Sequence, residues 1–220
     1  DYVKLPQLFT EKAFQLIRDE VNRLEQQAFP RDFIMDEFET VRRFGALDGS
    51  LLLEYSPILW SLYWHHAVIS LIEAIAGATV YPCQHPQEFM VAHYMVGDSA
   101  QHGWHTDDPA YGFLIIIDAP PPEQGGLLEM IPHWRDFCEQ EGVDPVHNLN
   151  PSAERARQAG LVRQRHHAAG DAYLFRADLT LHQVTPIVGN GRRVILNMAY
   201  DNTPEPQYGI TANRLYDYNR

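Results

Sequence analysis

The chain has 220 residues and a formal net charge of −12, from 17 Lys and Arg against 29 Asp and Glu. Binding to nucleic acid or to an anionic membrane surface needs clustered Lys and Arg, so this balance argues against both kinds of partner. Hydrophobic residues make up 45% of the chain, which is enough for a buried core. The length favours one domain over residues 1–220.

Two cysteines, Cys83 and Cys138, are too few for a disulfide framework, so we expect a reducing, cytoplasmic setting. The longest apolar run, Phe113 to Ile117, is far shorter than the roughly 18 residues of a membrane span. The first ten residues lack the basic start and the apolar stretch of a secretion signal. The unusual feature is the 11 histidines, which call for a metal or acid–base explanation.

The predicted elements begin with two helices. Residues 10–27 carry apolar side chains at three- and four-residue spacings, and Thr10 is suited to cap the start of this helix. Residues 57–76 form the second predicted helix, with Pro57 at its first position and Gly77 after its end. Both helices are expected to support the core.

From residue 89 the pattern changes to short strand-like runs separated by turns rich in Gly, Pro and Asn. These runs cover residues 89–96, 111–118, 126–131, 171–178, 180–188 and 192–201. An insertion at about 133–160 is expected to be helical. We therefore predict an α+β fold that is mainly β, in which residues 1–88 give helical support to a β-sandwich or barrel core at 89–200.

A candidate metal site begins with His105 and Asp107, which are two residues apart and therefore share a face on an extended segment. A His-x-Asp pair is unspecific by itself, but His182 on a later predicted strand is available as a third ligand. Two histidines and one carboxylate form the facial triad of non-haem Fe(II) oxygenases. A closed structural zinc site would need four protein ligands.

A candidate anion-binding arginine lies on the last predicted strand. Arg193 and Asn197 alternate with apolar residues and share one face, while Arg192 shares the opposite face with Val194. The apolar face is expected to pack against helices, which leaves the Arg193 face to line a polar cavity. A buried arginine there would bind the carboxylate of a small acid, with Arg192 as the alternative.

Together these residues resemble the Fe(II)/2-oxoglutarate-dependent dioxygenases. The resemblance covers about residues 89–200 and rests on His105-x-Asp107, on His182 after a Gly-Asp…Tyr-Leu-Phe run, and on Arg193 eleven residues later. It implies a double-stranded β-helix of the jelly-roll or cupin kind, Fe(II) held by the triad, and O2 as co-substrate. It also implies that 2-oxoglutarate chelates the iron while its far carboxylate meets Arg193.

The chain also resembles a narrower bacterial group, the free-amino-acid radical halogenases and their hydroxylase relatives, whose best-known members act on lysine. This likeness rests on spacings around the first metal histidine and on the segment 118–126. It implies a closed pocket for a small-molecule substrate, with the segment 201–220 near the active site. The residues implied to bind substrate are Arg42 for a carboxylate, Glu88 and Asp108 for an ammonium group, and His102, Asn197 and Tyr216.

Two departures from this group shape the expected reaction. Halogenases carry Gly where this chain has Asp107, so hydroxylation is the expected outcome. The lysine enzymes carry Thr at the position of Ala199 and Trp near Tyr216, so the amino acid need not be lysine. A basic or zwitterionic amino acid is expected, because two acids near a metal are costly unless a cation joins them.

Three questions stay open at this point. The same cofactor chemistry can desaturate or cyclise a substrate instead of hydroxylating it. A protein of another class, a non-catalytic cupin-like module that binds a small ligand or metal, would share the fold but would form no succinate. Arg43 has the same charge as Arg42 and is the alternative residue for the substrate carboxylate. The sequence also leaves the oligomeric state open, with a homodimer as one option.

Overall fold

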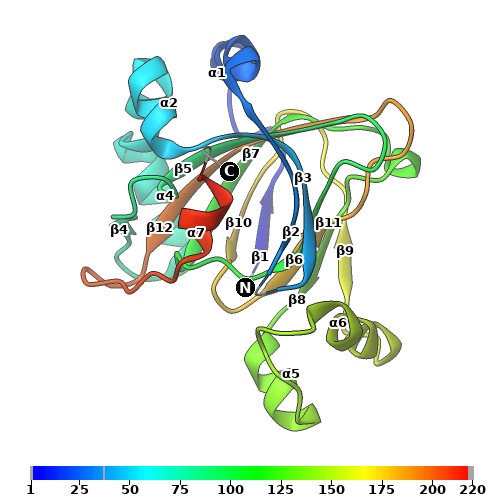
Figure 1. Cartoon of the computed structure of the whole chain (residues 1–220). Helices are drawn as coiled ribbons and strands as arrows, with labels where there is room; N and C mark the ends of the chain where they lie inside the picture. The colour runs from blue at the N-terminus through cyan, green and yellow to red at the C-terminus, as the bar shows by residue number, and fades with distance from the viewer. Residues whose placement is uncertain (1, 37, 218–220) are drawn as a thin grey trace.

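A computed structural model describes residues 2–36 and 38–217 (Figure 1). The chain starts with strand β1 (Tyr2–Leu5), followed by helix α1 (Glu11–Leu24) and the short 3-10 helix η1 (Glu25–Gln27). The hydroxyl of Thr10 accepts a hydrogen bond from the backbone N–H of Ala13 at 3.3 Å. The predicted first helix and its cap are therefore present, with a 3-10 turn at its end.

The second predicted helix is divided in two. Helix α3 (Pro57–Tyr63) and helix α4 (His66–Ala76) are separated at Trp64, and helix α2 (Gly49–Tyr55) precedes them. The predicted ends are confirmed, since Pro57 begins α3 and Gly77 closes α4 in the left-handed region. The Ser56 hydroxyl caps α3 by accepting a hydrogen bond from Leu59 N–H. By length and composition alone the stretch Pro57–Ala76 is long and apolar enough to cross a membrane, a property that core helices of soluble proteins share, and 22% of its most apolar window is buried.

The description of residues 1–88 as helical support is wrong in one respect, because this region also contributes strands. β2 (Phe29–Met35) and β3 (Thr40–Leu47) form an antiparallel hairpin, and β4 (Tyr81–Pro82) pairs with the last strand. Burial alternates along β3, but the polar residues Thr40 and Arg42 occupy buried positions. The strand therefore lacks the alternation of polar and apolar residues that marks a half-exposed strand.

The remaining strands confirm the predicted double-stranded β-helix. They are β5 (Met90–Val96), β6 (Gln101–His105), β7 (Tyr111–Asp118), β8 (Leu128–Ile131), β9 (Arg163–Arg165), β10 (Ala172–Arg176), β11 (Leu181–Val184) and β12 (Arg192–Asp201). Together with β1 and β3, these strands form one sheet in the order β1-β10-β7-β12-β5-β3-β6-β11-β8-β9. The sheet curls into a half-barrel, and β3 joins its two parts by pairing with β5 at one end and β6 at the other.

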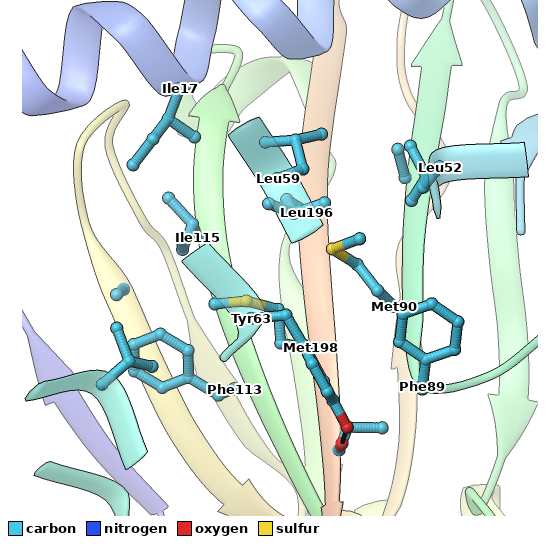
Figure 2. Packing of buried hydrophobic residues seen from close by; sticks show 14 of the residues in the cluster. Ile17, Leu52, Leu59, Tyr63, Phe89, Met90, Phe113, Ile115, Leu196 and Met198 are labelled. Carbon is cyan, nitrogen blue, oxygen red and sulfur yellow. Dashed lines mark hydrogen bonds between the residues drawn. The ribbon is translucent and has the colours of Figure 1, made fainter. Parts of the chain in front are cut away.

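Helices cover the outside of this barrel. Figure 1 shows α1 and α2 at one end, whereas α5 (Trp134–Glu141) and α6 (Leu149–Gln158) lie at the other, as predicted for a helical insertion. The short η2 (Pro122–Gln124) precedes β8, and α7 (Thr211–Leu215) follows β12. The main apolar cluster packs the first four helices against β5, β7 and β12, with Leu59 and Tyr63 over Leu196 and Met198 (Figure 2).

Strand alternation separates this core from the interior of the barrel. Val194 and Leu196 belong to the cluster under the helices, whereas Ile195 belongs to a second apolar cluster on the inner face with Leu114 and Phe175. The inner faces of the strands therefore enclose a separate space, and the polar residues of β12 that share the Ile195 face point into it.

Candidate functional site: a buried histidine–carboxylate cavity

A cavity fills the interior of the half-barrel, and it is lined by all ten residues that the sequence nominated. These are Arg42, Glu88, His102, His105, Asp107, Asp108, His182, Arg193, Asn197 and Tyr216. They come from four strands and three connecting segments that are far apart in the sequence. The antiparallel pairing of the strands is what brings them to one space.

The three predicted metal ligands converge at one point of the cavity. His105 ends β6 and His182 lies directly opposite it on β11, where the register slips and forms a bulge. Asp107 Oδ1 lies 3.5 Å from His105 Nε2 and 3.6 Å from His182 Nε2. One ligand atom of each residue falls within 4.8 Å of the others, a spacing that suits a single metal ion.

Both histidines are oriented for coordination. His105 Nδ1 donates to the carbonyl of Gly103 at 2.7 Å, and His182 Nδ1 donates to the carbonyl of Thr180 at 2.9 Å, which leaves each Nε2 as the free lone pair. Burial holds the pKa of His105 well below its usual value, and charge repulsion from His182 and Arg42 lowers it further. A neutral imidazole with a free Nε2 is the form that binds a divalent metal, so these residues fit iron.

The two candidate arginines of β12 have different surroundings. Arg193 lines the cavity, is 3% exposed, and within the described residues its Nη2 has no hydrogen-bond partner. Arg192 points to the outside, where it forms ion pairs with Glu25 at 2.5 Å and Asp118 at 3.1 Å. The strand therefore alternates as predicted, and Arg193 is the arginine that can reach a ligand in the cavity.

Arg42 is held inside the cavity at the junction of β3 and β6, opposite His102. Its Nη1 donates to the Thr40 hydroxyl at 2.9 Å, whereas Nε and Nη2 lie buried without a partner in the part of the chain that the structure describes. Burial lowers the pKa of Arg42 to about 9. Arg43, the alternative by charge, faces outward and pairs with Asp32.

Acidic groups also line the cavity. Oε2 of Glu88 is buried, and no donor among residues 2–36 and 38–217 reaches it. Asp108 Oδ2 accepts the backbone N–H of Gly209 at 2.9 Å. Burial raises the pKa of both carboxyl groups, and Asp108 and Asp107 raise that of Glu88 further. A cavity that presents both free guanidinium atoms and uncompensated carboxyl groups is suited to a ligand that carries both charges.

The structure adds residues that the sequence did not single out. His93 on β5 and Tyr173 and Phe175 on β10 line the same cavity. The only sequence signal for these residues is their position on an inward face of a strand. Side chains of the apolar core have the same signal, so it does not identify a cavity residue. None of the described cavity-lining residues comes from the insertion at 133–160, whose buried side chains belong to an apolar cluster with Leu181.

Glu88 gives a prediction that concerns stability alone. Its pKa is higher in the folded chain than in the unfolded chain, so the folded chain keeps the proton between the two values and stability falls as pH rises through that interval. Glu88→Gln should therefore raise the melting temperature of the ligand-free protein at neutral pH and flatten its decline with pH. Thermal unfolding at several pH values, with exposed Glu123→Gln as control, measures this. An unchanged pH slope in the Glu88 variant would contradict it.

Comparisons with known proteins identify a family for the chain. The family model for Halogenase D matches residues 1–218. None of the curated protein sequences compared with the chain matches it.

Similar folds occur in solved structures of low sequence identity. The epimerase SnoN, from nogalamycin biosynthesis, in complex with Fe3+, alpha ketoglutarate and nogalamycin RO, is 15% identical with a TM-score of 0.65, covering 91% of this chain and 78% of that one. HygX from Streptomyces hygroscopicus, with nickel and 2-oxoglutarate bound, is 13% identical with a TM-score of 0.63, covering 94% and 85%. EctD from S. alaskensis, with 2-oxoglutarate and 5-hydroxyectoine, is 17% identical with a TM-score of 0.63, covering 91% and 71%.

These likenesses show the fold, and the family match extends over nearly the whole chain. The resemblance inferred from the triad and the arginine spacing is thereby confirmed. The chain belongs to the Halogenase D family and has the jelly-roll fold of iron- and 2-oxoglutarate-dependent enzymes.

Proposed function

We propose that this protein is an Fe(II)/2-oxoglutarate-dependent oxygenase that hydroxylates an unactivated C–H bond of a free amino acid. The observation that carries the proposal is the His105, Asp107 and His182 triad inside a cavity that also presents guanidinium nitrogens and a carboxyl oxygen without partners among the described residues. Two free, buried cysteines are compatible with the reducing, cytoplasmic setting that we propose for it.

Different residues would bind the metal and the co-substrate. His105, Asp107 and His182 would hold the iron, and Arg193 would bind the far carboxylate of 2-oxoglutarate through its guanidinium fork. The loaded centre supplies the oxidation, in which 2-oxoglutarate and O2 yield succinate, CO2 and a hydroxyl group on the substrate. The inner faces of β7, β8 and β10 are apolar at this end of the cavity and would disfavour water there.

The charged side chains of the cavity would orient the amino acid. Arg42 would hold its carboxylate, while Glu88 and Asp108 would hold an ammonium group, with His102, Asn197 and Tyr216 completing the hydrogen bonds. The buried Oδ1 of Asn197 and Nε2 of His102 have no partner in the described chain, so both have bonds to offer. Fixing both ends of a small substrate places one carbon against the reacting centre, which is where orientation is most valuable.

The presence of Asp107 favours hydroxylation over halogenation. In the family likeness a glycine at this position leaves a coordination site open for chloride, whereas the Asp107 carboxylate lies within reach of both metal histidines. Desaturation and cyclisation use the same residues and differ only in the fate of the substrate radical. The product mass therefore decides between these outcomes.

A mass-spectrometric screen tests the proposal. The protein would be incubated with Fe(II), 2-oxoglutarate, ascorbate and air against a panel of free amino acids that includes ornithine and other basic ones. We expect succinate and the gain of one oxygen on one amino acid, whereas loss of two hydrogens would identify desaturation or ring closure. Absence of succinate across the panel, with iron shown to be bound, would contradict the proposal and support a non-catalytic binding protein.

The acidic groups of the cavity give a kinetic prediction. Asp108→Asn and Glu88→Gln should each raise the amino-acid KM about tenfold or more, because each removes a charge-assisted hydrogen bond to an ammonium group. The 2-oxoglutarate KM should stay within about twofold of the wild-type value, since that co-substrate is held by Arg193 and the iron. Steady-state kinetics with each substrate varied in turn measures both constants. Equal changes in the two constants, or none, would show that these acids do not bind the amino acid.

A further inference from the structure

The C-terminal segment, residues 211–217, borders the mouth of the cavity. The partly exposed residues of the cavity lining are Glu88, Asn197, the loop Thr106–Asp108 and Thr211, the first residue of α7. The chain just before α7 contacts that loop, since Gly209 N–H donates to Asp108. Leu215 and Tyr216 then line the interior. The C-terminal segment therefore lies between solvent and part of the cavity.

Three buried apolar side chains hold this segment in place. Helix α7 has five residues, and its buried side chains are Ala212 and Leu215, followed by Tyr216 just beyond its end. Residues 202–210 before it are mostly exposed. A short segment with three buried apolar side chains, after an exposed stretch of chain, opens at a lower free energy than the barrel on which it rests.

Hydrogen bonds from other elements compensate for this. The outer side is fixed by Arg31 of β2, which donates to the carbonyls of Arg214 at 3.2 Å and Asp217 at 3.1 Å. Gln87 donates to the carbonyl of Tyr216 at 3.2 Å. These bonds hold the backbone of the segment but leave the inward-pointing side chain of Tyr216 to a different partner.

That partner is His93, on the wall of the cavity. His93 is 6% exposed, and its Nε2 lies 3.3 Å from the Tyr216 hydroxyl. Its ring contacts Phe44, with centroids 4.4 Å apart, and His102 edge-on at 5.3 Å, so its position is fixed by packing. Burial, together with the nearby Arg193 and Arg42, lowers the pKa of His93 to about 3. The ring is therefore neutral, and its Nε2 and the Tyr216 hydroxyl share a hydrogen bond whose donor depends on the tautomer of the ring.

We propose that His93 is a positioning residue that holds the C-terminal segment closed over the cavity through the Tyr216 hydroxyl. This hydrogen bond joins strand β5 to the C-terminal segment at Tyr216, whose side chain faces the cavity. The same bond fixes the Tyr216 hydroxyl at the cavity wall. There it would contact the carboxylate of the amino acid beside Arg42, and this second part of the inference rests on the proposed function.

Hydrogen–deuterium exchange measured by mass spectrometry tests the closing role without iron, 2-oxoglutarate or amino acid, so its outcome does not depend on the proposed function. His93→Phe keeps the ring and removes the polar atom. We expect amide exchange in residues 211–217 to rise about tenfold in His93→Phe and in Tyr216→Phe. The double variant should exchange no faster than either single variant, because all three lack the same bond.

The matched control is His167→Phe. His167 is also a buried histidine, with a pKa lowered to about 3 by burial, but it stacks on Tyr173 and bonds to the Tyr2 hydroxyl at 2.7 Å. Neither contact involves residues 211–217, so their exchange should stay unchanged in this variant. Unchanged exchange in His93→Phe and Tyr216→Phe, or an equal rise in His167→Phe, would overturn the closing role.

A kinetic readout then tests the substrate part. With the amino acid found by the screen, His93→Phe should raise the amino-acid KM about tenfold and leave the 2-oxoglutarate KM unchanged. His93→Gln, whose amide can place a donor or an acceptor near the position of Nε2, should recover most of the loss. Faster exchange together with an unchanged amino-acid KM would keep the closing role and overturn the contact with the substrate.

Discussion

Replacing Asp107 with glycine is expected to abolish hydroxylation and to weaken iron binding by more than about a hundredfold. Loss of a group that merely orients a metal ligand costs about 10–100-fold in affinity, and Asp107 supplies the ligand atom itself. The two histidines would remain, held by their bonds to the carbonyls of Gly103 and Thr180. Anaerobic calorimetric titration with Fe(II) and mass analysis of the product measure both effects.

The neighbouring acid provides the control. Asp108 follows Asp107 in the chain, and one of its carboxylate oxygens accepts the N–H of Gly209. Asp108→Asn keeps the triad, so it should bind iron normally while its amino-acid KM rises. Hydroxylation that survives in Asp107→Gly, or iron affinity that falls equally in both variants, would contradict the assignment of Asp107 as a ligand.

Arg193→Ala is expected to raise the 2-oxoglutarate KM about a hundredfold. Breaking a buried, hydrogen-bonded charge pair costs roughly 2–5 kcal/mol, because the carboxylate left behind has no counter-charge. The Arg193 guanidinium is buried in the cavity wall with Nη2 free for a ligand in the described structure. Arg193→Lys keeps the charge without the planar fork and should fall between the wild type and the alanine variant. Steady-state kinetics with 2-oxoglutarate as the varied substrate provides the measurement.

Arg192→Ala is the matched control, since it removes the same side chain one residue earlier. Its guanidinium bonds to Glu25, Asp118 and Asn22 outside the cavity, so we expect a modest loss of stability and an unchanged 2-oxoglutarate KM. If Arg192→Ala raised this constant and Arg193→Ala did not, the assignment of the two residues would be reversed.

Local features of the sequence determined much of the site. Asp107 lies two residues after His105, and Asn197 lies four after Arg193, so each pair meets on one face whenever its segment is extended. The apolar alternation of β12 placed Arg193 inside and Arg192 outside, which is where the structure has them. These inferences were possible because strand geometry has a period of two and needs no knowledge of the partner strands.

Other features depended on contacts between distant segments, and only the tertiary structure decided them. Arg42 reaches the cavity because β3 bends from β5 to β6, a path that its own residues do not encode. His93 becomes a partner of Tyr216 only when a segment 123 residues away folds across the mouth of the barrel. The sequence by itself therefore determined the candidate metal ligands, the orientation of Arg193 and the fold class. The closing segment and its anchor had to come from the packed structure, because pairing between remote segments leaves no periodic signal in either one.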